Sequence, residues 1–204
     1  MIEPPNKRVV AFVDGQNLFN AAKKAFGYGF PNYDPLKLAK LVCGQQIRWD
    51  LTKLCFYTGM PSPKRDAQRH LFWKAKLGSM GRNKDLVQTF SRPLVYRDGI
   101  AQEKGIDVRL ALDAVRLAHE AAYDVALIFS QDQDFSEVAV EIRRIAAAYD
   151  RWIKVACAFP VSSVYLNKRG IDKTDWITID HALYDQAIDP VNYRSRFPSL
   201  RIGF

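Results

Sequence analysis

Apolar and polar residues alternate along the chain in blocks that predict strands and helices in turn. One unbroken apolar run covers residues 9–13 and another covers residues 125–129. A short apolar run that ends in polar turn residues is typical of a strand buried on both faces, as in a parallel sheet between helices. The first run ends in Asp14, and the second leads into Asp132 and Asp134. The pattern therefore places carboxylates at the carboxyl ends of two strands, where open α/β sheets bind their ligands.

The segments that follow these runs have helical spacing. After the first run we expect a helix from Leu18, with Gly15 allowing a tight turn and Asn17 as the capping residue. Strand and helix patterns then follow one another to the end of the chain, with helices over residues 35–42, 64–84, 103–121 and through 138–149, and strands over residues 50–57, 85–96, 153–159 and 176–179. This alternation predicts an α/β fold with a mostly parallel central sheet and helices on both faces.

The helix expected over residues 103–121 carries a further carboxylate near its start. Asp107 falls at the N-cap or in the first turn, where the helix dipole and the free backbone amides favour a negative charge. Val108 and Leu112 have the spacing of a stripe that packs on the sheet. Asp113 lies about 120° around the helix from Asp107, so the two carboxylates do not share a face. Asp107 is therefore the stronger candidate for the site.

These carboxylates are expected to converge. If the two apolar strands are parallel neighbours, Asp14 and Asp132 meet at one edge of the sheet, with Asp134 in the adjoining loop and Asp107 close by. Like charges held this close are unfavourable unless a cation lies between them, and a divalent ion with oxygen ligands meets that need. A structural interpretation, in which Asp14 and Asn17 only shape the turn from strand to helix, stays open.

Composition limits the kind of protein and its partners. A chain of 204 residues with 48% apolar residues can bury one sizeable core, so we expect a single domain. The formal net charge of +8 suits a polyanionic partner. Cys43, Cys55 and Cys157 are odd in number and lack a CxxC spacing, which argues against a disulfide framework and indicates a cytoplasmic protein. We expect no signal peptide and no membrane span.

Basic residues gather in the helix expected over residues 64–84, in the loop over residues 160–174 and in the tail from residue 190. Aromatic side chains lie among the cations of the helix, and a nucleic acid would contact such a face through its backbone and bases. Alternatively, the aromatic residues belong to the core and the cations are only solvated. The candidate RNA contacts in the helix and the loop are Arg69, Lys74, Lys168 and Arg169, and the tail adds Arg194, Arg196 and Arg201.

Three short motifs, in this order within residues 9–135, resemble those of the NYN domains, a family of PIN-like nucleases. They are Phe-Val-Asp-Gly-Gln-Asn at residues 12–17, Lys-Gly-Ile-Asp at residues 104–107 and Ser-x-Asp-x-Asp-Phe at residues 130–135. The resemblance implies a Rossmann-like, PIN-like three-layer sandwich that binds Mg²⁺ or Mn²⁺ and hydrolyses RNA. On this basis, residues 1–204 form one such domain, with a basic extension from about residue 186.

The resemblance also assigns roles to individual positions. The acidic cluster that would hold the metal and carry catalysis matches Asp14, Asp107, Asp132 and Asp134, with Asn17 beside the first aspartate. Lys104 and Ser130 match further motif positions, and Lys104 is a candidate RNA contact. Gln131 stands where the family usually has glycine, so this chain departs from the pattern in the backbone geometry of that loop.

Two other enzyme classes fit the sequence poorly. A Rossmann oxidoreductase needs Gly-x-Gly-x-x-Gly after the first strand, whereas residues 14–17 offer one glycine beside a carboxylate. An aspartyl phosphatase needs a second acid two residues after the first, where this chain has Gln16. The predicted function is therefore metal-dependent hydrolysis of RNA, with a non-catalytic RNA-binding module as the alternative. Single-stranded DNA also stays open as a substrate.

Overall fold

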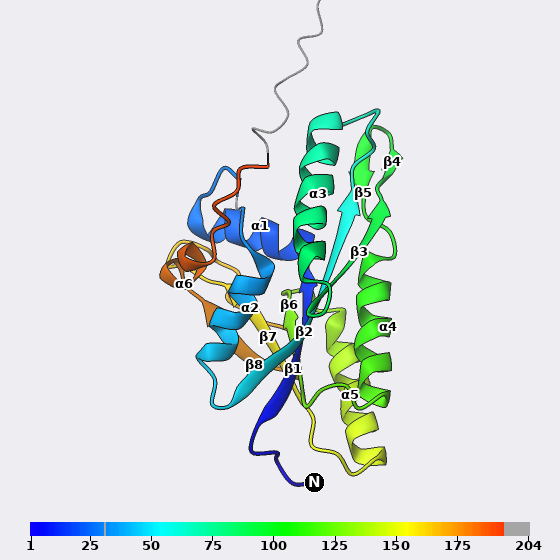
Figure 1. The fold of residues 1–204 in the computed structure, drawn as a ribbon, viewed down its shortest axis with the longest axis vertical. Coiled ribbons are helices and arrows are strands. Elements are labelled where there is room, and N and C mark those ends of the chain that lie inside the picture. Colours follow the sequence, from blue (N-terminus) through cyan, green and yellow to red (C-terminus); the bar gives the residue numbers. More distant parts are fainter. Residues whose placement is uncertain (31, 194–204) are drawn as a thin grey trace, which may run out of the picture.

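A computed structural model describes residues 1–30 and 32–193, and its centre is a six-stranded parallel sheet (Figure 1). The strand order is β3-β2-β1-β6-β7-β8, and every pair of neighbours in it is parallel. The strands are β1 (Lys7–Asp14), β2 (Trp49–Met60), β3 (Val87–Pro93), β6 (Val125–Phe129), β7 (Lys154–Pro160) and β8 (Asp175–Ile179). The predicted α/β fold with a parallel sheet is confirmed.

Helices cover both faces of this sheet and give the molecule three layers (Figure 1). Alternate residues of β2 enter the two cores, since Leu54 and Phe56 belong to one and Cys55 and Tyr57 to the other. The first core is completed by α1 (Gly15–Phe26), α2 (Pro35–Gly44), α3 (Ala67–Met80) and α6 (His181–Gln186), and the second by α4 (Ile106–His119) and α5 (Phe135–Ala148). None of the helices in the described ranges is long and apolar enough to cross a membrane.

The strand β1 lies at the centre of the arrangement because it pairs with both β2 and β6. Its residues from Val9 onward are buried, as an apolar strand with a neighbour on each side requires. The register sets Asp14 opposite Tyr57 of β2, and Val13 opposite Phe129 of β6. The two strand ends predicted from the sequence are therefore neighbours at the same edge of the sheet.

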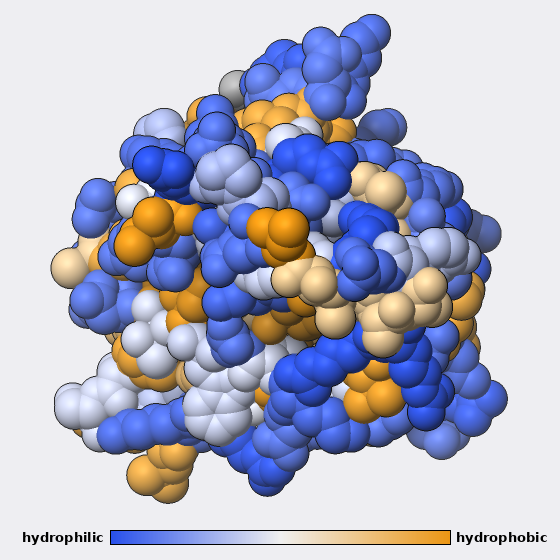
Figure 2. All heavy atoms as spheres, turned by 90° about the horizontal axis from the view of Figure 1, so that it is seen from below, coloured by the Kyte–Doolittle hydropathy of each residue, from blue (hydrophilic) through white to orange (hydrophobic). Residues whose placement is uncertain are grey.

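The edge strand β3 continues into a small hairpin. Its last residue is Pro93, which an edge strand tolerates because one side of it makes no ladder bonds. The hairpin consists of β4 (Val95–Arg97) and β5 (Ile100–Gln102), and a 3-10 turn (Gly81–Asn83) precedes β3. Seen from below, near the N-terminus, the surface is mainly hydrophilic and its apolar side chains form small separate patches (Figure 2).

The expectation that Val108 and Leu112 pack on the sheet was wrong. Val108 and Leu112 of α4 are 61% and 63% exposed, whereas the stripe that includes Ile106 and Leu110 packs on the sheet. Both stripes are apolar with helical spacing, so the pattern alone cannot choose between them. Asp113 is buried with the second stripe, and its carboxylate accepts hydrogen bonds from Arg109 and from Tyr57.

The start of α1 also differs from the expectation. The helix begins at Gly15 and its cap is Asp14, whose Oδ1 accepts a hydrogen bond from the Asn17 backbone N–H at 3.0 Å. Asn17 lies inside the first turn instead of capping it. Glycine is required at residue 15 for close packing, since a Cβ there would lie 2.6 Å from Cζ of Phe56 and 2.8 Å from the Tyr57 carbonyl oxygen.

One cation of α3 has a structural role that its sequence context did not suggest. Lys76 is buried, and its Nζ donates to Asn32 Oδ1 at 2.7 Å, to the Tyr33 carbonyl at 2.6 Å and to Asp189 Oδ2 at 3.1 Å. Burial lowers the pKa of Lys76, and the charge of Asp189 opposes that shift. These bonds join α3 both to the segment before α2 and to the segment after α6. The arginines at residues 194, 196 and 201 lie outside the described residues.

Replacing Lys76 with alanine should destabilise the fold by about 3–5 kcal/mol, because it leaves the Asp189 carboxylate, whose side chain is only 12% exposed, without its cation. Lys74→Ala is the matched control, since Lys74 is exposed on the same helix and its loss should change the free energy of unfolding by less than about 0.5 kcal/mol. Urea unfolding at pH 7 measures both. Equal effects of the two substitutions would show that the buried ion pair does not hold α3 in place.

Candidate active site

The carboxylate of Asp14 is the most buried of the acidic residues predicted to form the site. It is 4% exposed at the end of β1, where Oδ1 accepts from Asn17 N–H at 3.0 Å and Oδ2 accepts from the Ser130 hydroxyl at 3.2 Å. Burial raises the pKa of Asp14 to about 7, and the charges of Glu103 and Asp107 act in the same direction. Its two hydrogen bonds oppose that shift but do not cancel it.

Backbone and side-chain hydrogen bonds hold the loop after β6 against this carboxylate. The Ser130 hydroxyl accepts from Asp132 N–H at 3.1 Å, and Asp132 Oδ1 accepts from Asp134 N–H at 3.1 Å. Asn17 Oδ1 accepts from the Gln131 N–H at 3.0 Å, which ties the loop to the first turn of α1. Asp132 is half-buried and Asp134 is exposed, so both carboxylates lie on the open side of the edge.

Asp107 approaches the same place from the start of α4. It occupies the first turn after Gly105, whose φ of 70° lies in the left-handed region that glycine adopts without strain. Burial raises the pKa of Asp107, and the charges of Asp132 and Asp134 add to the effect. The charge of Asp107 in turn raises the pKa of Asp14. Asp107 thus couples electrostatically both to Asp14 and to the two loop carboxylates.

A further carboxylate, Glu103, belongs to this cluster and was missed by the sequence analysis. Its Oε1 accepts a hydrogen bond from the Gly59 N–H at the end of β2. Burial raises the pKa of Glu103, as does the charge of Asp107, and the Gly59 N–H opposes both. The only signal in the sequence is its position four residues before Asp107. Its contact with Gly59 joins distant parts of the chain, which local spacing does not reveal.

The predicted cations are exposed, but they do not form one face. Arg69 and Lys74 lie on α3 about 140° apart around the helix axis. Lys104 is next to Glu103 in sequence and is exposed. Lys168 and Arg169 belong to the long loop after β7, where the Arg169 guanidinium pairs with Asp172.

Gln131, at the position where the resemblance led us to expect glycine, fastens this long loop to the acidic edge. It is 8% exposed, and its Nε2 donates to the carbonyl oxygens of Asn167 at 3.1 Å and of Arg169 at 3.0 Å. Gln133 adds a similar bond to the Gly170 carbonyl at 2.9 Å. Gln131, the residue that departs from the motif, therefore holds the basic loop beside the carboxylates.

The donor set suits a hard divalent cation. Within residues 1–30 and 32–193, no three His, Cys, Asp or Glu side chains are arranged to enclose an ion together. These residues therefore do not form a closed structural zinc site, which needs four protein ligands. Mg²⁺ commonly binds through one or two carboxylates and keeps several water ligands, so carboxylates gathered loosely at an open edge fit it better. Mn²⁺ prefers the same oxygen donors.

The fold and this edge define an α/β protein with a parallel sheet and acidic residues where the parallel strands end. Comparison with known proteins gives the family. Residues 8–149, more than half of the chain, match the NYN domain, so the protein belongs to the NYN domain family, a family of PIN-like nucleases. The sequence-based assignment to this family is confirmed.

A solved structure has the same fold. It is a protein of unknown function from Vibrio parahaemolyticus, 20% identical in sequence, with a TM-score of 0.54. The alignment covers 89% of this chain and 98% of that one, so the likeness extends over nearly the whole fold. No curated protein matches the chain significantly.

Asp14→Asn should stabilise the protein at pH 8 but not at pH 4. Since the pKa of Asp14 is about 7 when folded, against an ordinary 3.8, the folded state binds more protons between these values, and stability falls as pH rises through them. The variant does not lose stability in this pH range, because asparagine does not ionise, and its side-chain oxygen can still accept the hydrogen bond that caps α1. Urea unfolding in EDTA should show a gain of roughly 2–4 kcal/mol at pH 8 and none at pH 4.

Glu141→Gln is the control for this experiment, because Glu141 lies on α5 and faces solvent beside Arg144. Its substitution should leave the pH dependence unchanged. A stability difference between wild type and Asp14→Asn that is the same at both pH values would contradict the protonation of Asp14 in the folded state.

Proposed function

We propose that this protein is a divalent-metal-dependent nuclease that hydrolyses RNA phosphodiester bonds at the carboxyl edge of its sheet. The observation that carries the proposal is the coupling of carboxylates along this edge, where the charges of Glu103 and Asp107 raise the pKa of Asp14 and those of Asp132 and Asp134 raise the pKa of Asp107. Carboxylates that repel one another in this way are stabilised by a bound cation. Perturbed carboxylates at an open edge are also typical of functional sites.

Asp14, Asp107, Asp132 and Asp134 would hold the metal. Bound Mg²⁺ or Mn²⁺ supplies acidification of a water molecule and stabilisation of charge on the attacked phosphate. The Ser130 hydroxyl and the Asn17 N–H fix the orientation of the Asp14 carboxylate. The hydrogen bond that Asn17 Oδ1 accepts from the Gln131 N–H fixes the orientation of the amide, and its Nδ2 group would donate to a phosphate oxygen.

The surrounding cations would bind the RNA backbone. Lys168 and Arg169 lie on the loop that Gln131 holds beside the carboxylates, and Lys104 follows Glu103. Arg69 and Lys74 extend this charge over α3. Each cation that contacts a phosphate contributes about one unit to the slope of log affinity against log salt.

A non-catalytic RNA-binding module is the second candidate. The observation that favours it is the loose arrangement of the carboxylates, none of which form a group of three around one point in the described ranges. In this case the acidic residues would shape the edge without supporting turnover. The two candidates differ in what the loss of a single carboxylate does to binding and to cleavage.

Asp132→Asn should reduce cleavage of a fluorescent single-stranded RNA in Mg²⁺ or Mn²⁺ by at least about 100-fold, because the carboxylate would help to hold the ion that stabilises the transition state. In EDTA, the same variant should bind RNA as tightly as the wild type or slightly more tightly, since a negative charge near the phosphates is lost. Glu141→Gln serves as the matched control and should cleave at the wild-type rate. Cleavage by a folded Asp132→Asn at the wild-type rate would refute the proposed mechanism.

Addition of millimolar Mg²⁺ or Mn²⁺ should raise the melting temperature, because an ion that binds only the folded state stabilises it by mass action. The rise should be absent in Asp14→Asn, measured against the metal-free melting temperature of that variant. Isothermal titration calorimetry gives an independent readout without RNA. If neither ion binds at millimolar concentration, the metal-dependent mechanism fails and the binding module becomes the better explanation.

A further inference from the structure

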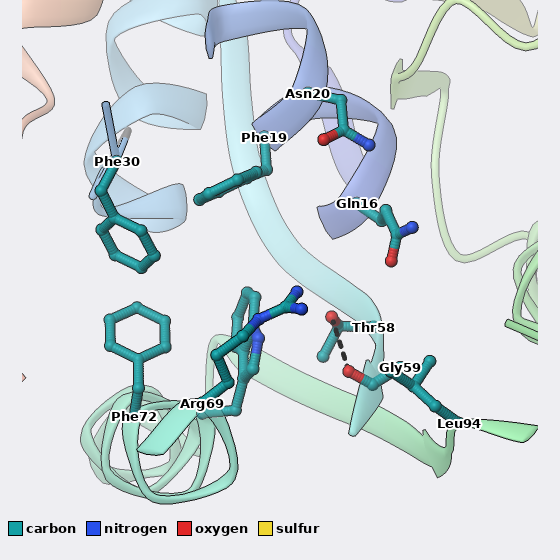
Figure 3. Close-up of a pocket in the computed structure, with 10 residues that line it drawn as sticks. Gln16, Phe19, Asn20, Phe30, Thr58, Gly59, Arg69, Phe72 and Leu94 are labelled. Atoms are coloured by element: carbon teal, nitrogen blue, oxygen red, sulfur yellow. Dashed lines mark hydrogen bonds between the residues drawn. The ribbon is translucent and has the colours of Figure 1, made fainter. Parts of the chain in front are cut away.

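A groove between α1 and α3 opens beside the acidic edge, and of its lining only Arg69 has a role in the proposed function. Figure 3 shows its inner end, where Gln16, Phe19 and Asn20 of α1 face Arg69 of α3 across the end of β2. A second hollow continues outward between the same helices and reaches Lys23 and Gln68. The two hollows share their aromatic wall and Arg69, so together they form one continuous groove.

The inner end of the groove lies next to the carboxylates. Gln16 follows Asp14 by two residues, and Asp14 is paired in the sheet with Tyr57, the residue before Thr58. Gly59, which lines the groove, donates its N–H to Glu103 of the acidic cluster. A polymer chain bound across the edge would therefore have the carboxylates on one side and the groove on the other.

Aromatic rings line one wall. The ring centroids of Phe19 and Phe30 are 5.2 Å apart with planes at 70°, and those of Phe30 and Phe72 are 4.8 Å apart at 87°. Phe19 and Phe30 are only half-buried, so part of each ring faces the groove (Figure 3). Such rings offer a stacking surface to a flat aromatic ligand.

Polar groups lie at the inner end. Thr58 is 2% exposed, yet the bond from its hydroxyl to the Gly59 carbonyl is 3.5 Å long. Buried hydroxyl groups usually have a better partner than this. Figure 3 shows the Arg69 guanidinium and the Gln16 amide directed toward the same space as this hydroxyl. The groove thus combines a stacking wall with hydrogen-bonding groups and a cation.

We propose that this groove binds an unpaired nucleobase next to the phosphate at the carboxylates. This inference rests on the proposed nuclease function and adds a base-binding subsite to it. The ring of Phe19 would stack on the base, and Phe30, whose plane lies at 70° to that of Phe19, would contact the edge of the base. Thr58 would hydrogen-bond to the base, and Arg69 would contact the adjoining phosphate. A base that is paired within a duplex is stacked between its neighbours and cannot enter.

The test compares two ligands of equal charge. Fluorescence anisotropy in EDTA measures the affinity for a labelled RNA 12-mer without self-complementarity and for a labelled 12-mer with the same sugar–phosphate backbone but no bases. The wild type should bind the RNA about tenfold more tightly, because stacking and hydrogen bonding require the base. Phe19→Leu should reduce the ratio of the two affinities toward one. Thr58→Val, which removes the hydroxyl but keeps the side-chain shape, should also reduce this ratio.

Phe26→Leu is the matched control. Phe26 lies on the same helix but packs against His181, with ring centroids 4.9 Å apart, and against Tyr184, outside the groove. This variant should keep the wild-type ratio. Circular dichroism and thermal melting establish that all three variants are folded before their affinities are compared.

Each outcome bears on one or both proposals. Equal affinity of the wild type for both ligands, or a wild-type ratio in both Phe19→Leu and Thr58→Val, would overturn the base-binding groove, while RNA cleavage in Mg²⁺ or Mn²⁺ would still support the nuclease. A ratio that falls as expected without any cleavage would support the groove and refute the nuclease. If neither ligand binds, both proposals fail.

Discussion

The burial of one carboxylate, Asp14, constrains the whole active edge. Its strand lies between β2 and β6, so the side chain enters a region from which water is largely excluded, and burial raises its pKa to about 7. The charged form is tolerated only with donors close by, and Asn17 and Ser130 supply them from the elements on either side. An asparagine would cap α1 equally well without this cost, so helix capping alone does not explain an aspartate here.

Around this point the edge is divided into two chemically different sides. The start of α4 brings Glu103 and Asp107 to one side, while α1 and α3 form the aromatic groove on the other. The end of β2 links the two, because Thr58 lines the groove and Gly59 bonds to the acidic cluster. An RNA strand bound here would be oriented, with its phosphate at the carboxylates and its base in the groove, as cleavage at a defined position requires.

The sequence predicted the parts of this site that depend on local pattern. An apolar run that ends in Asp14 and a second that leads into Asp132 indicated two buried strands, and parallel pairing was enough to bring their ends together. Local sequence pattern did not predict the contacts between residues far apart in the chain. The Glu103 carboxylate accepts a hydrogen bond from Gly59, and the buried Lys76 ammonium pairs with Asp189. In α4, the apolar stripe that packs on the sheet is a different one from the stripe that contains Val108. Each of these depends on which surfaces meet after folding.

The same limit applies to charge. A net charge of +8 suits RNA, but it does not say which cations are available to bind it. Lys76 is engaged in the core, whereas Arg69 and Arg169 are exposed and each pairs with a neighbouring aspartate, Asp66 and Asp172. Charge can therefore draw a polyanion to the surface without selecting among polyanions. Selection requires groups that recognise something other than phosphate, and the aromatic wall of Phe19 and Phe30 lies where such recognition would act on the nucleotide nearest the carboxylates.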